Sequence, residues 1–329
     1  MHLMGGAVQY AVKYIINPAR VIELTQNQYF SVVAESTNHK GIIGSGTIWN
    51  GALNIGSENL PYGFLNTLLV HPSYRKNGIA KEIANWRINQ FEKKFGKEGV
   101  VYASIQKGNK GSENTASKWC THFYPNRITL LPIKPRYRSV PFNSSFTVES
   151  ICSEDIEEVV EQLNIFHKDY ELYIPHSSKS FRNWLSKDLN GAPLHHYWLV
   201  KDKSGNILGG IGFIEDYRMR VIEILKMPFS MKIFNSVLKV IPSNKILRQS
   251  KLSFCWFKPN QQKAAKYLLE NIRYHWRNET DNILCYFDTK SPWVKILGAS
   301  PFMPSTISSI ALKSPIGLGD NKLIYFAPI

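Results

Sequence analysis

The first third of the chain shows the alternation of apolar and polar positions that is typical of β-strands. Residues 29–35 and 41–48 are rich in β-branched and aromatic side chains, and a polar turn over 36–40 separates them, which predicts a β-hairpin. Residues 65–70 then form a nearly continuous apolar run, typical of a buried strand. The pattern therefore predicts three strands in succession.

The spacing of apolar residues changes after this third strand. His71-Pro72 stops the strand, and Ile79, Ile83 and Trp86 recur at helical spacing, which predicts an amphipathic helix packed on a sheet. Residues 99–105 predict the next strand. The order is thus strand, turn, helix, strand.

The turn between the third strand and the helix carries the most specific chemistry in the chain. It reads Val-His-Pro-Ser-Tyr-Arg-Lys-Asn-Gly-Ile-Ala over residues 70–80. The first N–H groups of a helix have no intrahelical partner, and the helix dipole adds positive charge there, so a pyrophosphate fits this position. Gly78 lets the backbone approach phosphates closely, while Arg75 and Lys76 add full charges.

This string resembles motif A of the GCN5-related N-acetyltransferases (GNAT), Arg/Gln-x-x-Gly-x-Gly/Ala after a strand and a proline-containing turn. Arg75, Gly78 and Ala80 match the motif, and the Val-x-Pro-x-Tyr pattern over 70–74 matches its lead-in. The resemblance covers about residues 30 to 125 and implies acetyl-CoA as co-substrate, with no metal. The cofactor-binding residues that it implies are Leu69, Val70, Arg75, Lys76, Asn77, Gly78, Ile79, Ala80 and Asn114.

The resemblance is less informative about catalytic residues. In the family, a backbone N–H near Leu69 or Val70 would meet the thioester carbonyl, and a glutamate four residues before the motif valine often acts as base. This chain has Asn66 at that position, and an amide cannot accept a proton at neutral pH. The candidate bases are therefore Glu58, His71 or a water chain acting beside Asn66. Tyr124 is the preferred acid, with a packing role as the alternative.

The second half repeats the same order of predicted elements. Residues 131–145 mix proline, serine and basic residues, which is typical of a linker. We therefore predict a GNAT-like acetyl-CoA-binding domain over 1–130, a linker over 131–145 and a second, degenerate GNAT-like domain over 146–329. In the second domain Lys-Pro-Asn-Gln-Gln stands in place of the phosphate motif. The predicted fold class is α/β with mixed sheets in two tandem acyltransferase-like domains.

The predicted first domain is short at its N-terminal side. About 28 residues precede the hairpin, where members of the family usually have a strand and one or two helices. Either this domain is a shortened variant or its start lies upstream, and truncation is favoured. A missing first strand would leave an unpaired sheet edge that promotes association.

Composition and charge set the outer limits of the function. Of 329 residues 43% are hydrophobic and the net charge is +15; residues 1–145 hold 17 Lys/Arg against 7 Glu, a net of +10. A positive field of this kind suits an anionic cofactor. The four cysteines lack paired or metal-like spacing. No leader or membrane-spanning stretch is evident, so a cytoplasmic location is expected.

These observations predict an acyl-CoA-dependent N-acyltransferase that moves acetyl from acetyl-CoA to an amine by direct attack in a ternary complex. The expected acceptor is an amine-bearing small molecule or a peptide, with no nucleic acid and no stable membrane association. Two alternatives are an acyl-CoA sensor without turnover and a basic module that binds nucleic acid or a membrane surface. The acceptor, the oligomeric state and any ligand of the second domain stay open.

Overall fold

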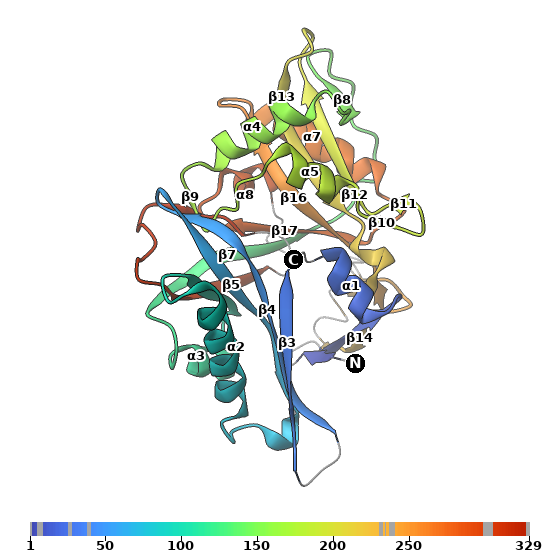
Figure 1. The fold of residues 1–329 in the computed structure, drawn as a ribbon. Coiled ribbons are helices and arrows are strands. Elements are labelled where there is room, and N and C mark those ends of the chain that lie inside the picture. The colour runs from blue at the N-terminus through green and yellow to red at the C-terminus, as the bar shows by residue number, and fades with distance from the viewer. Residues whose placement is uncertain are drawn as a thin grey trace.

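The computed structural model describes residues 2–4, 9–25, 28–37, 41–229, 233, 235–236, 241–298 and 305–326. Its main feature is one continuous sheet of eleven strands that runs through both halves of the chain (Figure 1). The strand order is β3-β4-β5-β6-β18-β7-β17-β16-β13-β12-β8.

From β3 to β6 the elements of the first half follow the predicted order, and further elements lie on either side. They are β1 (His2–Met4), β2 (Gln9–Tyr14), α1 (Pro18–Thr25), β3 (Tyr29–Glu35), β4 (Ile42–Ile55), β5 (Glu58–Val70), η1 (Pro72–Tyr74), α2 (Ile79–Phe95), β6 (Val100–Gln106), α3 (Lys110–Ala116) and β7 (His122–Ile133).

The second half has more short elements, most of them between its main strands. The described elements are β8 (Thr147–Ser150), α4 (Ile156–His167), β9 (Tyr170–Glu171), α5 (Ser178–Leu185), β10 (Asp188–Leu189), β11 (Ala192–Pro193), β12 (His195–Lys201), β13 (Ile207–Ile214), η2 (Asp216–Arg218), β14 (Arg220–Lys226), β15 (Ile246–Leu247), β16 (Gln249–Phe257), α7 (Gln262–His275), β17 (Asn282–Asp288), α8 (Pro292–Leu297), β18 (Thr306–Lys313) and β19 (Leu323–Ile324).

The parallel ladders of the two halves correspond pair by pair. In the first half, residues 62–64 of β5 pair in parallel with residues 100–102 of β6. In the second half, residues 249–251 of β16 pair in parallel with residues 282–284 of β17. Each ladder has three pairs, and a helix that lies on the sheet connects its two strands, α2 in the first half and α7 in the second. The internal repeat is therefore visible in the register of the strands, although their sequences differ.

The two halves exchange their last long strands. β18, from the end of the chain, pairs antiparallel with β6 over 308–313 and 101–106. β7, from the first half, pairs antiparallel with β17 over 128–133 and 283–288. β18 and β7 also pair with each other. Each half is consequently completed by a strand of the other, and β7 and β17 cross the middle of the molecule (Figure 1).

The faces of the sheet are covered by layers with separate apolar clusters. In the first half α2 packs on one face, where Ile88 and Phe91 meet Ile48 and Leu65. In the second half the helices α4, α5 and α7 surround the strands β12, β13 and β16 (Figure 1). Burial of these apolar side chains is the main stabilising contribution to both layers.

The N-terminal strands lie outside the main sheet. β1 and β2 join β14 and β15 in a separate four-stranded sheet. In the described part of the chain, β3 is therefore the edge of the main sheet, whereas the corresponding strand β12 of the second half has β8 beside it. The expectation of a first half without its own first strand agrees with this arrangement.

The predicted α/β fold class is confirmed, with a mixed sheet that carries both repeated units. The predicted domain limits stay a prediction. β7 continues through residues 131–133, and residues 134–146 have neither helix nor strand. Because β18 completes the first half of the sheet, a contiguous division of the sequence does not coincide with a division of the sheet.

Candidate functional site

The candidate site lies where β5 and β6 separate. Their parallel ladder ends at the pair Phe64–Tyr102, although β5 continues to Val70 and β6 to Gln106. Beyond that pair β6 has β18 on its other side, and β5 keeps β4. The two strands therefore leave a notch between their carboxyl ends, which is a common position for ligands in sheets with parallel strands.

A β-bulge changes the direction of β5 within this notch. The antiparallel partners are Thr47 with Asn66 and Ser45 with Leu69, so Gly46 alone faces two residues of β5. Thr67, one of these two, has a φ of 53°, a left-handed conformation that is uncommon for a residue other than glycine. A bulge removes backbone groups from the regular ladder, so the strand can present backbone N–H groups to a ligand here.

The loop from β5 to α2 is arranged to leave N–H groups free at the helix start. Gly78 is the N-cap residue of α2, with a φ of 81° and no side-chain cap. The first backbone bond of the helix is donated by the Glu82 N–H to the Gly78 carbonyl, 3.1 Å away. The N–H groups of Ile79, Ala80 and Lys81 come before that bond and point out of the helix end, as an anion site requires.

The loop also positions positive charge next to these N–H groups. Arg75 donates from Nε to the carbonyl oxygen of Val70 at 3.2 Å, which ties the guanidinium to the end of β5. Arg75, Lys76 and Asn77 are exposed. Lys76 has a φ of 68°, so two left-handed residues, Lys76 and Gly78, shape the turn before the helix. The loop thus combines exposed cations with outward N–H groups.

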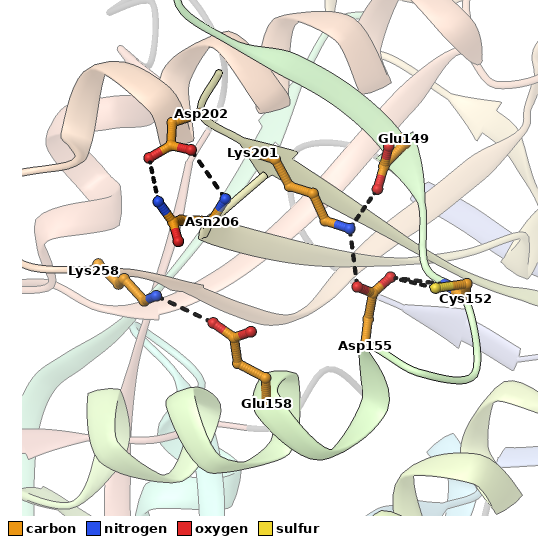
Figure 2. A network of polar contacts seen from close by, with 8 residues as sticks. All are labelled: Glu149, Cys152, Asp155, Glu158, Lys201, Asp202, Asn206 and Lys258. Atoms are coloured by element: carbon orange, nitrogen blue, oxygen red, sulfur yellow. Dashed lines mark hydrogen bonds and ion pairs between the residues drawn. The ribbon is translucent and has the colours of Figure 1, made fainter. Parts of the chain in front are cut away.

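The equivalent position in the second half has no such loop. There the chain passes from β16 to α7 through residues 258–261 only. Lys258, at the start of this turn, forms an ion pair with Glu158 of α4, with Nζ and Oε1 3.2 Å apart. Figure 2 shows this pair beside a second group in which Lys201 contacts Glu149 and Asp155. Because the turn is short and its lysine is paired with Glu158, it offers no comparable anion site.

Aromatic side chains line the corresponding gap of the second half. Its bulge residue Phe254 has a φ of 48° and packs against Trp184 with ring centroids 4.7 Å apart. A cavity of about 20 Å³ remains between β16 and β17, bordered by Asp288 and Tyr325 among others. A space of this size holds about one water molecule. The gap between β16 and β17 is therefore largely filled by side chains.

The proposed cofactor residues lie together, and the proposed catalytic residues do not. Leu69 and Val70 follow the bulge, and the loop and the start of α2 continue directly from them. Asn114 is exposed on α3, which contacts α2. Glu58 opens β5 at its hairpin end. Since β5 has 13 residues at roughly 3.3 Å each, Glu58 and Val70 lie about 40 Å apart along the strand.

Two further catalytic candidates have structural partners. The Asn66 carbonyl accepts a hydrogen bond from Arg87 at 2.9 Å, and Asn66 itself forms the last regular pair before the bulge. The Tyr124 hydroxyl oxygen accepts a hydrogen bond from the Leu318 N–H at 2.7 Å. Tyr124 lies on β7, with β18 between it and β6. Its packing role is thus established by contacts, and an acid role stays a prediction.

Aromatic side chains fill the region behind the notch. Phe64 and Tyr102, the last ladder pair, have ring centroids 4.8 Å apart, and Tyr62 lies 5.9 Å from Tyr102. Phe326, from the C-terminal segment, packs edge-on against Phe64 at 5.8 Å. Burial raises the pKa of Tyr62 to about 12. These rings lie at the last ladder pair, where β5 and β6 begin to separate.

Sequence reasoning missed two residues of this region. Arg87 lies on the buried face of α2 with Ile83 and Ile88. A charged residue at the helical spacing of the apolar positions was the signal that could have identified it. The bulge at Thr67 had no signal, because threonine has no preference for positive φ. The bulge follows from the register of β4 and β5, and the role of Arg87 follows from its burial and its hydrogen bonds to both strands.

Comparisons with known proteins agree with the geometry. Residues 9–120 match the model of the acetyltransferase (GNAT) family. The structure is similar to Saccharomyces cerevisiae N-myristoyltransferase with bound myristoyl-CoA, with 12% identity and a TM-score of 0.57, over 96% of this chain and 75% of that chain. It is also similar to a GCN5-related N-acetyltransferase from Sphaerobacter thermophilus, with 13% identity and a TM-score of 0.52, over 88% and 82% of the two chains. A search of curated proteins found no match.

The family match and the structural similarity cover different parts of the chain. Residues 9–120 match the GNAT family model, as the sequence motif predicted. The whole chain shares its fold with the N-acyltransferases of the structural comparison. Among the described residues, no group of three or more His, Cys, Asp or Glu side chains is arranged to hold a metal ion. In the same part of the chain, no helix is long and apolar enough to span a membrane.

Proposed function

We propose that this protein is an acyl-CoA-dependent N-acyltransferase that transfers acetyl from acetyl-CoA to an amine. The observation that carries the proposal is the contrast between the two notches. The first has a loop with exposed cations and outward N–H groups at the start of α2, whereas the second has a short turn whose lysine is paired with Glu158. The cofactor would bind to the first half alone.

The reaction needs few groups in this arrangement. The pyrophosphate would lie on the loop over residues 75–80, and the thioester would extend between β5 and β6. A backbone N–H near Leu69 or Val70 would polarise the thioester carbonyl, which favours the tetrahedral intermediate. The amine attacks the carbonyl carbon, the C–S bond breaks, CoA leaves as the thiolate, and the proton lost by the amine passes through water to that thiolate.

The packing behind the notch supports a short acyl group. Phe64 is 4% exposed and Tyr102 7% exposed, and Phe326 covers Phe64 from the far side. A long acyl chain that extended past the last ladder pair would have to displace these rings. Acetyl requires no such displacement. The acceptor would be an amine of a small molecule or a peptide that reaches the notch from its open end.

The decisive experiment compares glycine variants at the two ends of α2. Gly78 and Gly96 both have positive φ, and a Cβ at either meets nothing within 4 Å. Gly78→Asp would place a negative charge where the pyrophosphate should bind, Gly78→Asn would add a similar shape without charge, and Gly96→Asp would control for backbone strain. Each variant is unfolded thermally with and without acetyl-CoA.

We expect acetyl-CoA to stabilise the parent and Gly96→Asp. At a hundred times its dissociation constant, a ligand stabilises by about 2.7 kcal/mol. Gly78→Asp should lose this stabilisation, with Gly78→Asn between the two. If Gly78→Asp responds to acetyl-CoA as the parent does, the pyrophosphate does not bind at this loop.

A second candidate function is acyl-CoA binding without transfer. The position of Glu58 at the far end of β5 and the amide at residue 66 favour it, because neither supplies a base at the notch. Release of free CoA from acetyl-CoA, measured with a panel of amines, separates the two functions. A binder would stabilise with acetyl-CoA and release no CoA above the rate without amine.

A further inference from the structure

A buried arginine lies beneath the bulge of the candidate site. Arg87 is 1% exposed, and among the described residues its recorded partners are backbone carbonyls and no carboxylate. Burial lowers the pKa of Arg87 to about 10, so the side chain keeps its charge at neutral pH. An unpaired buried charge is costly unless it is well hydrogen-bonded, which calls for a specific reason for its presence.

The contacts of Arg87 join α2 to both strands at the bulge. Nη1 donates to the carbonyl oxygens of Thr47 at 2.7 Å and Asn66 at 2.9 Å, and Nε donates to that of Ile83 at 3.3 Å. Thr47 and Asn66 are the last regular pair before the bulge. The Asn66 carbonyl belongs to the same peptide unit as the Thr67 N–H. A cation on that carbonyl polarises the peptide and strengthens the N–H as a donor.

The residue opposite the bulge makes room for the guanidinium. A Cβ built on Gly46 would lie 2.9 Å from Arg87 Cζ and 2.8 Å from Ile83 Cγ2. Side chains do not approach so closely without displacement, so a residue larger than glycine would push the guanidinium away from the two carbonyls. Gly46 and Arg87 therefore act as a pair.

The second half provides an internal comparison because it contains the same bulge without the arginine. There Gly210 pairs with Trp256 and Gly212 with Ser253, so Ile211 alone faces two residues. The buried stripe of α7 repeats the spacing of the stripe of α2 and is apolar throughout, with Leu268 in phase with Arg87. Ile211 and Leu268 belong to one apolar cluster. A bulge of this kind thus forms above an apolar pair.

We infer that Arg87 is a positioning residue for acyl transfer: its hydrogen bonds to the Thr47 and Asn66 carbonyls hold the bulge of β5, and with it the backbone N–H groups of Leu69 and Val70 that would polarise the thioester carbonyl. The inference rests on the proposed function. The half that has the loop over residues 75–80 has the arginine, and the half that lacks the loop has Leu268 at the equivalent position. The repeated fold therefore does not require the buried charge, which occurs together with the proposed cofactor site. Its effect would be largest when negative charge develops on the thioester oxygen.

The test compares Arg87→Met, Arg87→Lys and Ile88→Ala in the full chain. Methionine keeps the length of the side chain without its charge, and lysine keeps the charge without the planar fork. Ile88 is the next residue of α2, is 3% exposed, and serves as a control for loss of core packing. For each protein we would measure the thermal shift with acetyl-CoA, kcat and KM for transfer, and the infrared carbonyl frequency of bound acetyl-CoA labelled with ¹³C at the thioester.

In Arg87→Met we expect kcat to fall about tenfold or more with KM for acetyl-CoA nearly unchanged, since the lost interaction acts mainly in the transition state. The bound carbonyl frequency should rise towards its value in solution. Arg87→Lys should recover part of both effects. Ile88→Ala should lower the melting temperature while keeping the parental kcat and carbonyl frequency.

The outcomes separate the inference from the proposed function. A parental kcat and carbonyl frequency in Arg87→Met would overturn the role of Arg87 and leave the transferase proposal standing. If the carbonyl frequency depends on Arg87 but the parent acylates no amine, the role of Arg87 is supported and the proposed transferase activity is overturned. A parent that does not bind acetyl-CoA would overturn both.

Discussion

Three histidines make the stability of the fold sensitive to acid, of which His167 and His195 are buried and His176 is partly exposed. Burial lowers the pKa of His167 to about 3 and that of His176 and His195 to about 4. Two of the rings are held by backbone carbonyls: Nδ1 of His167 lies 3.0 Å from the Leu163 oxygen, and Nδ1 of His195 lies 2.7 Å from the Trp184 oxygen. All three belong to the second half of the chain, so acid should act there first.

Between pH 6.5 and 4 the unfolded chain binds protons on these histidines and the folded chain does not. Stability therefore falls as the pH drops through this range. A pKa of about 4 for His176, against an ordinary value near 6.5, corresponds to about 3 kcal/mol lost by pH 4. We expect His176→Phe to reduce the proton uptake on unfolding by one, measured from denaturant unfolding between pH 4 and 7. An unchanged pH dependence in that variant would show that His176 titrates normally in the folded state.

The β3 strand is the element whose environment differs most between the halves. Tyr29 is 39% exposed and Val33 52% exposed, and the strand contains no lysine. Its counterpart β12 is covered by β8, with residues 198–201 paired to 147–150. In the described part of the chain β3 is an open edge whose one charged side chain, Glu35, stands at its end, and such an edge can pair with another chain.

We expect the protein to self-associate with increasing concentration through this edge, and Val33→Lys to reduce the association. A lysine on an edge strand opposes strand addition by its charge. Sedimentation velocity over a range of concentrations measures the effect, and Ile165→Lys is the control, because Ile165 is 49% exposed on α4. A monomeric parent at all concentrations would show that the edge is not available for pairing.

At the scale of the whole molecule, the strand exchange couples the two halves. β18 lies between β6 and β7, and the β4–β5 turn is held by the second half, where Gly56 donates from its N–H to Glu171 Oε2 at 2.8 Å. Backbone bonds of 2.7 and 2.8 Å between Asn54 and residues 172–173 add to this contact. Neither half has a complete sheet without the other.

We therefore expect one cooperative unfolding transition by calorimetry. Ile310→Ala, in the buried centre of β18, should cost about 2–5 kcal/mol and should accelerate hydrogen exchange in β6 and β7 together. Leu163→Ala, an equally buried change on α4, should accelerate exchange locally in the second half before it does so in β6. Two separate transitions, with β6 insensitive to Ile310→Ala, would contradict the coupling of the halves.

Local sequence patterns were sufficient for several elements and for the turn between β5 and α2. The apolar run before His71 and the helical spacing from Ile79 predict β5 and α2 because both elements are set by short-range periodicity. The loop itself was recognisable because an anion site at a helix start needs a glycine and cations within a few residues. Asn66 lies within the strand predicted over 65–70, whereas Glu58 was not assigned to that strand, and the length of β5 separates Glu58 from the notch.

The sequence by itself thus determined the order of the elements, the repeat of that order and the position of the anion loop, since these depend on neighbours along the chain. Only the tertiary structure decided which strand completes which half, where β5 bulges at Thr67, and why Arg87 is buried. The physical reason is the range of the interactions. The ladder between β6 and β18 and the bonds from Arg87 to Thr47 and Asn66 join residues far apart in sequence, and no local pattern encodes them.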